Sequence, residues 1–278
     1  MAMLAEWEAN IRRMNEAIAR SMRRAVILCA VMATGGMAKA GETRCWVDHG
    51  AVVAPAAFGD IAGDFIIDLS RPTSALHDTR ANMNGITADE ARGRLALAGE
   101  RIPDIRMAVV DLDDQTRAFD TVINGVIGWD VLGRYAAELD LRAGRCRLKL
   151  SAAGRRVHRQ GAVLPLTQPG GAPAVPAAVA DDVGAQQGLF LIDTGREAVR
   201  VAGARLSRPQ RGKDKEAPIQ LRAVSVGGAL AEQVPAAVMD PAAPDVTGAL
   251  GLSVWRGGVL RLDPALGRVL FWKPRQDH

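Results

Sequence analysis

The sequence predicts an all-β protein built from two similar lobes, and three observations carry this prediction. An apolar run that ends in an acid occurs twice, and the two acids, Asp68 and Asp193, lie 125 positions apart. A Gly-x-x-Gly segment also occurs twice, at 125–128 and 248–251, with an offset of 123. Short apolar runs separated by turn residues are typical of strands and hairpins. Because the two offsets differ by only two residues, we infer that one unit of roughly 110 residues is duplicated.

Residues 1–40 are predicted to be a signal peptide or, alternatively, an N-terminal anchor that is retained. Two arginines precede the apolar run 25–33, and small residues in an A-x-A pattern end at Ala40. This arrangement is typical of a cleaved export signal, and the run is too short to span a bilayer. We therefore expect a periplasmic or secreted protein with no stable membrane insertion once the signal is removed.

The remaining chain is predicted to form an N-terminal lobe at 41–150, a linker at 151–163 and a C-terminal lobe at 164–278. The linker is basic and polar with little periodicity. Of the 35 Lys and Arg residues, six lie in residues 1–40, as do three of the 31 Asp and Glu residues. The body is therefore nearly neutral, and its basic clusters lack interleaved aromatic residues. We expect no nucleic-acid binding.

Each lobe contains the same order of predicted elements. The Gly-x-x-Gly segment precedes a short helix and then a closing hairpin, which turns at Gly144 in the first lobe and at Gly267 in the second. Alternating apolar residues at 94–102 and 219–230 predict one further hairpin in each lobe. Every predicted strand in one lobe thus has a counterpart in the other.

The acid segments resemble the active-site motifs of the aspartic proteases, both the retropepsin-like and the pepsin-like kinds. In that family Asp-Thr-Gly or Asp-Ser-Gly follows a hydrophobic strand. Asp193, Thr194 and Gly195 match this motif fully, and Asp68 is matched with Ser70 two positions later. The resemblance covers roughly residues 45–273 and implies two lobes that face each other across a pseudo-two-fold axis.

The resemblance also implies an activity, which is endopeptidase cleavage by Asp68 and Asp193 as a catalytic dyad. Two carboxylates this close hold one proton between them, because like charges at short range cannot both ionise. One acid then activates a water and the other protonates the peptide carbonyl. Ser70, Thr194 and Gly195 are expected to support the dyad.

The first motif departs from the family, and this departure keeps other functions open. Leu69 has no hydroxyl to reach across to the other lobe, although Ser70 can donate a hydrogen bond to a carboxylate. Arg71 and Arg196 follow the two motifs, and a guanidinium beside the dyad would favour ionisation of both acids. The alternative is a non-catalytic peptide-binding protein of the cell envelope, and a purely structural envelope protein is a third hypothesis.

The flap that covers the substrate in these proteases is expected between Asp68 and Gly125. Residues 81–86 contain Asn84 and Gly85, and Asn-Gly is the strongest short signal for a tight hairpin. Asn84 and Gly85 are therefore the predicted flap tip. An ordinary exposed loop is the alternative.

Two cysteines remain after residue 40, and we expect them to pair. Cys45 opens the first lobe and Cys146 lies in its closing hairpin, so in an oxidising compartment a disulfide would join the first and last strands of that lobe. The alternative is two separate buried thiols.

No other chemistry is predicted from the sequence. The four histidines show no metal-ligand spacing, and neither a phosphate loop nor a nucleophile elbow occurs. We expect no cofactor and no metal, a peptide or unfolded protein as the partner, and a monomer.

The export signal leads to the first testable prediction. Protein made in an exporting host should begin at Gly41, because the A-x-A pattern places the cleavage after Ala40. N-terminal sequencing of the mature protein measures this directly. An intact segment 1–40 on the exported protein would contradict the signal-peptide assignment.

Overall fold

The computed structural model describes residues 41–154, 161–202, 219–240 and 243–273, so the predicted signal segment 1–40 lies outside the described residues. Residues 40–278 form one compact unit. The elements of its N-terminal lobe are β1 (Gly41–Arg44), β2 (Trp46–Asp48), β3 (Ala51–Phe58), β4 (Ile61–Ile67), β5 (Ala75–His77), α2 (Asp78–Met83), β6 (Glu90–Leu97), β7 (Glu100–Val110), α3 (Asp113–Thr116), β8 (Ile123–Ile127), α4 (Trp129–Leu132), β9 (Ala136–Asp140) and β10 (Arg147–Ser151).

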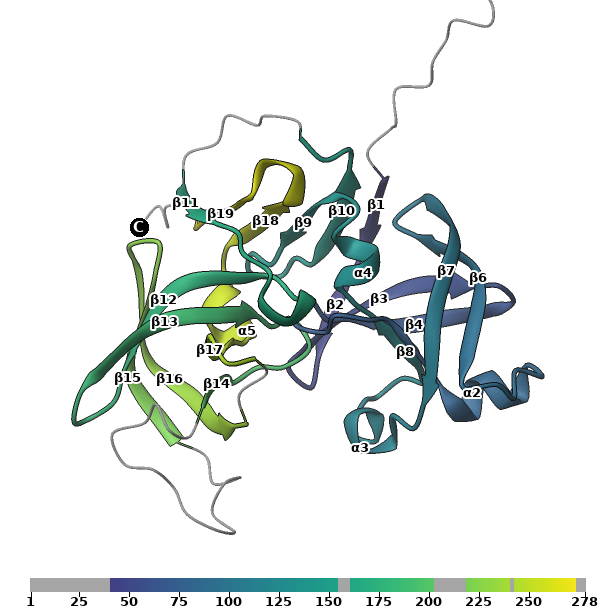
Figure 1. The fold of residues 1–278 in the computed structure, drawn as a ribbon, viewed down its shortest axis with the longest axis horizontal. Helices are drawn as coiled ribbons and strands as arrows, with labels where there is room; N and C mark the ends of the chain where they lie inside the picture. The colour runs from purple at the N-terminus through teal and green to yellow at the C-terminus, as the bar shows by residue number, and fades with distance from the viewer. Residues whose placement is uncertain (1–40, 155–160, 203–218, 241–242, 274–278) are drawn as a thin grey trace, which may run out of the picture. The chain divides into compact units, whose positions relative to one another are not determined.

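The C-terminal lobe repeats strands β3 to β10 as β12 to β19 (Figure 1). Its elements are β11 (Ala162–Pro165), the 3-10 turn η1 (Pro169–Gly171), β12 (Ala174–Ala180), β13 (Ala185–Ile192), β14 (Val199–Ala202), β15 (Ile219–Val226), β16 (Ala229–Met239), β17 (Val246–Leu250), α5 (Leu252–Trp255), β18 (Val259–Asp263), the 3-10 turn η4 (Pro264–Leu266) and β19 (Arg268–Trp272). The predicted linker 151–163 begins with the last residue of β10 and ends inside β11.

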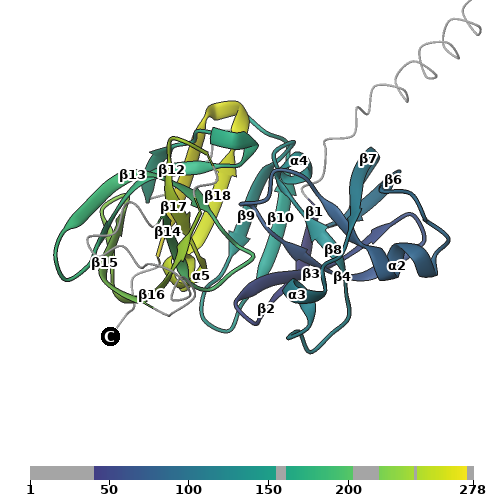
Figure 2. The same cartoon turned by 60° about the horizontal axis from the view of Figure 1, so that its bottom comes forward.

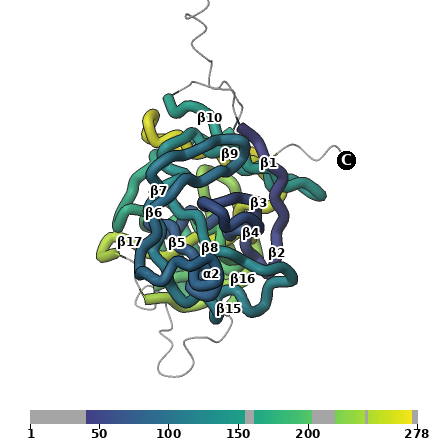
Figure 3. The backbone as a smooth tube through the Cα atoms, turned by 90° about the vertical axis from the view of Figure 1, so that its right-hand side faces the viewer, coloured from purple at the N-terminus to yellow at the C-terminus, as the bar shows by residue number. Residues whose placement is uncertain are grey.

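Each lobe is a ring of strands with the same order. The N-terminal lobe has the order β2-β3-β4-β8-β5-β7-β6, and an additional β3–β6 pairing brings β6 back to β3. In the C-terminal lobe β12-β13-β17-β14-β16-β15 form a closed barrel. Strands β3 to β8 therefore correspond one by one to β12 to β17. Figure 3 looks onto the N-terminal lobe from the side of β6 and β7. The predicted all-β, two-lobed fold is confirmed.

The two offsets in the sequence correspond to the strand register. β4 pairs in parallel with β8 so that Phe65 lies opposite Gly125, and β13 pairs in parallel with β17 so that Phe190 lies opposite Gly248. Both glycines are required by close approach. A Cβ on Gly125 would lie 2.3 Å from a carbonyl oxygen of β5, and one on Gly248 would lie 2.2 Å from a carbonyl oxygen of β14. The glycine repeat is thus a packing requirement of each lobe.

A third sheet joins the lobes. Its order is β1-β10-β9-β18-β19-β11, with three strands from each lobe, and Figure 2 shows β9, β10 and β18 between the two sets of lobe strands. β9 and β18 pair antiparallel, with Glu138 opposite Arg261. These two residues are themselves equivalent by the offset of 123, so the pseudo-two-fold axis passes between them.

The apolar runs of the sequence are buried on both faces of their strands. Phe65, at the start of the first run, and Phe190, the second apolar residue of the other run, are fully buried. The predicted short helices after the glycine segments are α4 and α5, and Trp129 and Trp255 on these helices are buried. Trp255 Nε1 donates to the carbonyl oxygen of Leu250 at 2.9 Å. Each short helix therefore closes one end of its lobe's core.

The tight hairpin predicted at residues 81–86 is wrong, whereas the flap role of Asn84 and Gly85 stays a prediction. Residues 78–83 form α2 rather than a hairpin strand, and Asn84 and Gly85 end this helix. The Gly85 N–H donates to the Asn82 carbonyl and the Ile86 N–H donates to the Ala81 carbonyl, both at about 3 Å. This is the Schellman arrangement, with Gly85 at φ 78°. Asn-Gly suits a hairpin turn and a helix C-terminus equally, because both require a residue at positive φ.

The expectation of one helix per lobe also needs correction, since α2 and α3 are additional short helices of the N-terminal lobe. The hairpins predicted at 94–102 and 219–230 are confirmed. They are β6–β7, which turns at Ala98 and Gly99, and β15–β16, which turns at Gly227 and Gly228. None of the helices that the structure describes has the length and apolar character to cross a membrane.

The predicted disulfide is confirmed. Cys45 and Cys146 are bonded, with their Cα atoms 4.9 Å apart. β1 pairs with β10 so that Arg44 lies opposite Arg147, and the Cys45 N–H continues this ladder to the Cys146 carbonyl at 3.1 Å. The bond therefore fastens β1, the first strand of the N-terminal lobe, to β10, the last strand of the same lobe.

Replacing both cysteines with serine should lower the free energy of unfolding by about 2–5 kcal/mol, because the bond closes a loop of 101 residues in the unfolded chain. Denaturant titration of the wild-type protein and the Cys45→Ser/Cys146→Ser variant measures this loss. Reductant should destabilise the wild type and leave the variant unchanged. Equal stability of the two proteins under oxidising conditions would contradict the prediction.

Candidate active site

Each candidate acid lies one residue beyond a buried parallel strand. Asp68 follows β4, and its N–H donates to the Ile127 carbonyl of β8 at 3.0 Å. Asp193 follows β13, and its N–H donates to the Leu250 carbonyl of β17 at 2.9 Å. The parallel pairing thus continues one residue past each strand and fixes the backbone of both acids. The structure brings the two equivalent turns to the junction of the lobes.

The turn after each acid holds one carboxylate oxygen. The Ser70 N–H donates to Asp68 Oδ1 at 2.9 Å, and the Gly195 N–H donates to Asp193 Oδ1 at 3.0 Å. The Ser70 hydroxyl adds a second bond to Asp68 Oδ1, at 2.7 Å. Ser70 therefore retains the backbone bond expected of a glycine at this position and contributes a hydroxyl donor as well.

The two acid turns are in contact. A Cβ on Gly195 would lie 2.7 Å from Asp68 Cγ and from Asp68 Oδ2, so any larger residue would displace the Asp68 carboxylate. Asp68 retains 8% of its surface exposed, and Asp193 is fully buried. The site is therefore a close pair of acids in which Asp68 is the more accessible member.

Thr194 joins the lobes through its side chain. Its hydroxyl accepts a hydrogen bond from the Leu69 N–H at 3.1 Å and donates to the Ile67 carbonyl at 2.6 Å. The Thr194 carbonyl accepts from the Val52 N–H at 2.8 Å. Leu69, the equivalent of Thr194, is buried and cannot return these bonds. The side-chain link across the pseudo-two-fold axis is thus one-sided.

Asp193 is also ion-paired. Arg200 of β14 places Nη2 at 2.7 Å from Asp193 Oδ2. Burial raises the pKa of Asp193 to about 6, and the negative charge of Asp68 acts in the same direction, whereas Arg200 and the Gly195 N–H oppose the rise. Below about pH 6 the site therefore holds a proton that an exposed aspartic acid would have lost near pH 4.

The arginine beside Asp193 is neither of the two that the sequence predicts there. Arg71 donates from Nε to the Thr73 carbonyl at 3.1 Å, and Arg196 is exposed. The ion pair comes instead from Arg200, seven positions after Asp193. The offset of 125 makes Arg200 the equivalent of Ala75. The presence of an arginine in one copy of the duplicated unit where the other has a small residue is the feature of the sequence that could have indicated this ion pair.

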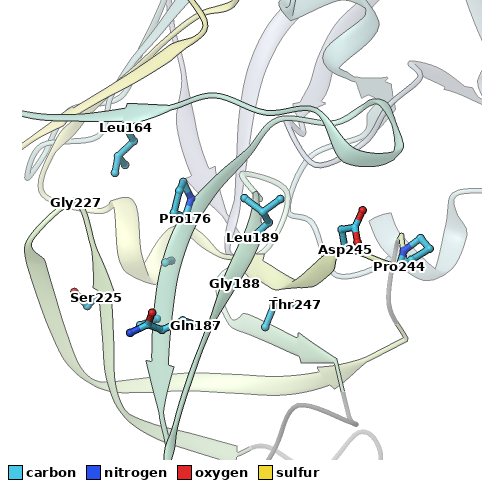
Figure 4. Close-up of a pocket in the computed structure, with 12 residues that line it drawn as sticks. Leu164, Pro176, Gln187, Gly188, Leu189, Ser225, Gly227, Pro244, Asp245 and Thr247 are labelled. Carbon is cyan, nitrogen blue, oxygen red and sulfur yellow. The ribbon is translucent and has the colours of Figure 1, made fainter.

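Among the hollows of the described residues, two occupy matching positions on the lobes. One of about 770 Å³ is lined by residues that include Pro176, Gly188 and Thr247 (Figure 4). Another of about 520 Å³ includes Pro55 and Gly63, the equivalents of Pro176 and Gly188. Neither acid is among the described residues that line either hollow. Their matching positions indicate that they arise from the duplicated framework rather than from the acid pair.

Within 41–154, 161–202, 219–240 and 243–273, no group of three or more His, Cys, Asp or Glu side chains is arranged to hold a metal ion. The groups available for chemistry at the junction of the lobes are the two carboxylates, the Ser70 hydroxyl and the Arg200 guanidinium.

Comparison with known proteins supports the fold. No protein-family model matches the chain, and no curated protein matches it in sequence. Among solved structures the chain is similar to the aspartic proteinase from Irpex lacteus, with a TM-score of 0.54 and 11% sequence identity, over 85% of this chain and 98% of that one. At this identity the likeness shows the fold alone. The chain has the two-lobed fold of the aspartic proteinases.

The Thr194 link leads to a stability prediction. Thr194→Val should lower the free energy of unfolding by about 2–4 kcal/mol, because it leaves the buried Leu69 N–H without its acceptor and removes the donor to the Ile67 carbonyl. Thr194→Ser retains the hydroxyl and should cost about 1 kcal/mol for the lost methyl group. Denaturant titration of the three proteins measures both values. Equal losses for Val and Ser would show that the hydroxyl bonds contribute little.

Proposed function

We propose that this protein is an aspartic endopeptidase whose catalytic dyad is Asp68 and Asp193. The observation that carries the proposal is the contact between the two acid turns, in which Gly195 packs against the Asp68 carboxylate. In support, each carboxylate accepts an N–H from the second residue of its own turn. This pairing supplies two equivalent acids, one from each lobe, which is the arrangement that general acid–base hydrolysis requires.

In the proposed reaction the proton on the dyad is held by Asp193, whose pKa is raised to about 6 mainly by burial. Asp68 takes a proton from a water, and the oxygen of that water forms a bond to the peptide carbonyl carbon. At the same time Asp193 donates its proton to the carbonyl oxygen. The tetrahedral intermediate then collapses. The carbonyl re-forms, the C–N bond breaks, the leaving amine takes a proton from Asp68, and Asp193 recovers its own.

A second candidate is a protein that binds peptides without cleaving them. The ion pair between Arg200 and Asp193 favours it, since a guanidinium stabilises the ionised acid and so opposes the protonated state that hydrolysis needs. The one-sided Thr194 link also favours it, because Leu69 gives the Asp68 turn less support from the other lobe. We place it second because the pKa of Asp193 is raised despite Arg200.

The proposed substrate is an extended peptide or unfolded protein, and the proposed compartment is the periplasm or the exterior, where the protein would act as a monomer. The Cys45–Cys146 bond supports an oxidising compartment, since disulfides persist there and are rare in the cytosol.

Asp68→Asn and Asp193→Asn should each lower kcat/KM for an unfolded protein substrate by about 10³-fold or more, because general acid–base catalysis contributes 10²–10⁴-fold and the two acids act as one unit. Asp60→Asn is the matched control. Asp60 is an exposed carboxylate in the turn between β3 and β4, and its amide should leave kcat/KM unchanged. Full activity in either dyad variant would refute the proposal.

The activity should also be highest in mildly acidic solution and fall as the pH rises through about 6, where Asp193 loses its proton. A statine-type transition-state mimic should inhibit it. Hydrolysis that is insensitive to the mimic would assign the activity to another protein in the preparation. A wild-type protein that binds peptides with no cleavage at any pH between about 3 and 7 would establish the second candidate.

A further inference from the structure

Arg200 breaks the equivalence of the two lobes at the dyad. β5 pairs with β8 so that Ala75 lies opposite Val126, and β14 pairs with β17 so that Arg200 lies opposite Ala249. Ala75 and Arg200 therefore occupy the same position in the duplicated unit. Ala75 is fully buried, and the Arg200 side chain is 24% exposed. A positive charge is thus present beside one acid of the pair and has no counterpart beside the other.

The guanidinium and the Asp193 carboxylate satisfy each other. Asp193 Oδ1 accepts from the Gly195 N–H, and Asp193 Oδ2 accepts from Arg200 Nη2. Arg200 Nε is buried and has no hydrogen-bond partner among the described residues. A partly buried guanidinium with so few donors in use depends on its counter-charge. Each group is therefore held in place by the other.

We propose that Arg200 is a positioning residue that sets the pH below which the dyad holds its proton. One consequence of this inference rests on the proposed function: Arg200 would confine peptide hydrolysis to acidic solution. Its physical content is a competition between two opposite charges that act on one buried carboxylate.

Three groups from three segments bear on Asp193. Asp68, from the turn after β4, opposes ionisation, and burial does the same. Arg200, from β14, and the Gly195 N–H, from the turn of Asp193 itself, favour ionisation. An opposite charge within hydrogen-bond distance changes the pKa of a carboxyl group by about 1–3 units. Without Arg200, Asp193 would retain its proton to a higher pH.

The chain itself suggests the test variant. Arg200→Ala installs the residue found at the equivalent position of the N-terminal lobe, and Arg200→Gln removes the charge while retaining a shorter polar side chain. Arg200→Lys retains the charge. Arg222→Ala is the matched control, because Arg222 forms an exposed ion pair with Asp182 on the same lobe, at 2.8 Å, and its loss changes the net charge by the same amount.

The first measurement is independent of activity. A carboxyl group whose pKa is raised by folding contributes stability that is present below its unfolded pKa, near 4, and is lost as the pH rises through its folded pKa. The difference in stability between each full-length protein and its own Asp193→Asn derivative, followed from pH 3.5 to 8.5, should therefore fall as the pH rises from about 4 and level off near pH 6, the folded pKa, in the wild type. Arg200→Ala and Arg200→Gln should raise this levelling pH by about one unit or more.

The second measurement is the pH dependence of kcat/KM, whose alkaline limb should move upward by the same amount in Arg200→Ala and Arg200→Gln. Arg200→Lys should restore the wild-type limb and levelling pH, and Arg222→Ala should leave both unchanged. An unmoved or lowered levelling pH in the two neutral variants overturns the proposal, and so does a levelling pH in Arg200→Lys that matches that of Arg200→Ala.

The two measurements separate this inference from the proposed function. If no variant cleaves peptides and the levelling pH still moves upward on loss of Arg200, the endopeptidase assignment fails and the role of Arg200 in the proton affinity of the dyad is supported. If Arg200→Ala does not fold, Arg200→Gln decides the outcome, because its side chain is neutral but larger than alanine and polar.

Discussion

The contact between the Asp193 turn and the Asp68 turn is the constraint on which the rest of the structure depends. Gly195 packs against the Asp68 carboxylate, and the Thr194 hydroxyl bonds to the backbone on both sides of Asp68. At the other end of the pseudo-two-fold axis, β9 pairs with β18 through Glu138 and Arg261. The lobes are thus joined at two places along one axis, and the buried strands between these places have little freedom to shift the acids.

Burying a carboxylate costs free energy because the group loses its hydration, and hydrogen bonds within the site offset part of this cost. The backbone N–H groups of Ser70 and Gly195 each donate a hydrogen bond to one oxygen of the acid in their own turn, and Arg200 donates to the second oxygen of Asp193. Burial still raises the pKa of Asp193, since these bonds replace only part of its hydration. A buried acid that can be protonated near neutral pH is poorly suited to stabilise a fold and well suited to exchange a proton.

The duplicated unit has diverged at a few positions around the acids, while the framework has stayed the same. Gly125 and Gly248 remain because each faces a carbonyl oxygen with no room for a Cβ. The turn positions were freer to change. Ser70 differs from Gly195 because its side chain lies beside its own carboxylate, where a hydroxyl can donate, whereas a side chain on Gly195 would collide with the opposite acid.

The sequence by itself determined the duplication, because backbone contacts such as those at Gly125 and Gly248 restrict residue type at fixed spacings, and it predicted Asp68 and Asp193 as the two acids whose turns the structure brings together. It also indicated the Cys45–Cys146 bond from the positions of the two cysteines in the lobe. Only the tertiary structure decided that Asn84 and Gly85 end a helix, since a residue at positive φ serves a helix end as well as a hairpin. Likewise, the partner of Asp193 is the more distant Arg200 rather than Arg196, because strand β14 turns the Arg200 side chain toward the acid and leaves Arg196 in solvent.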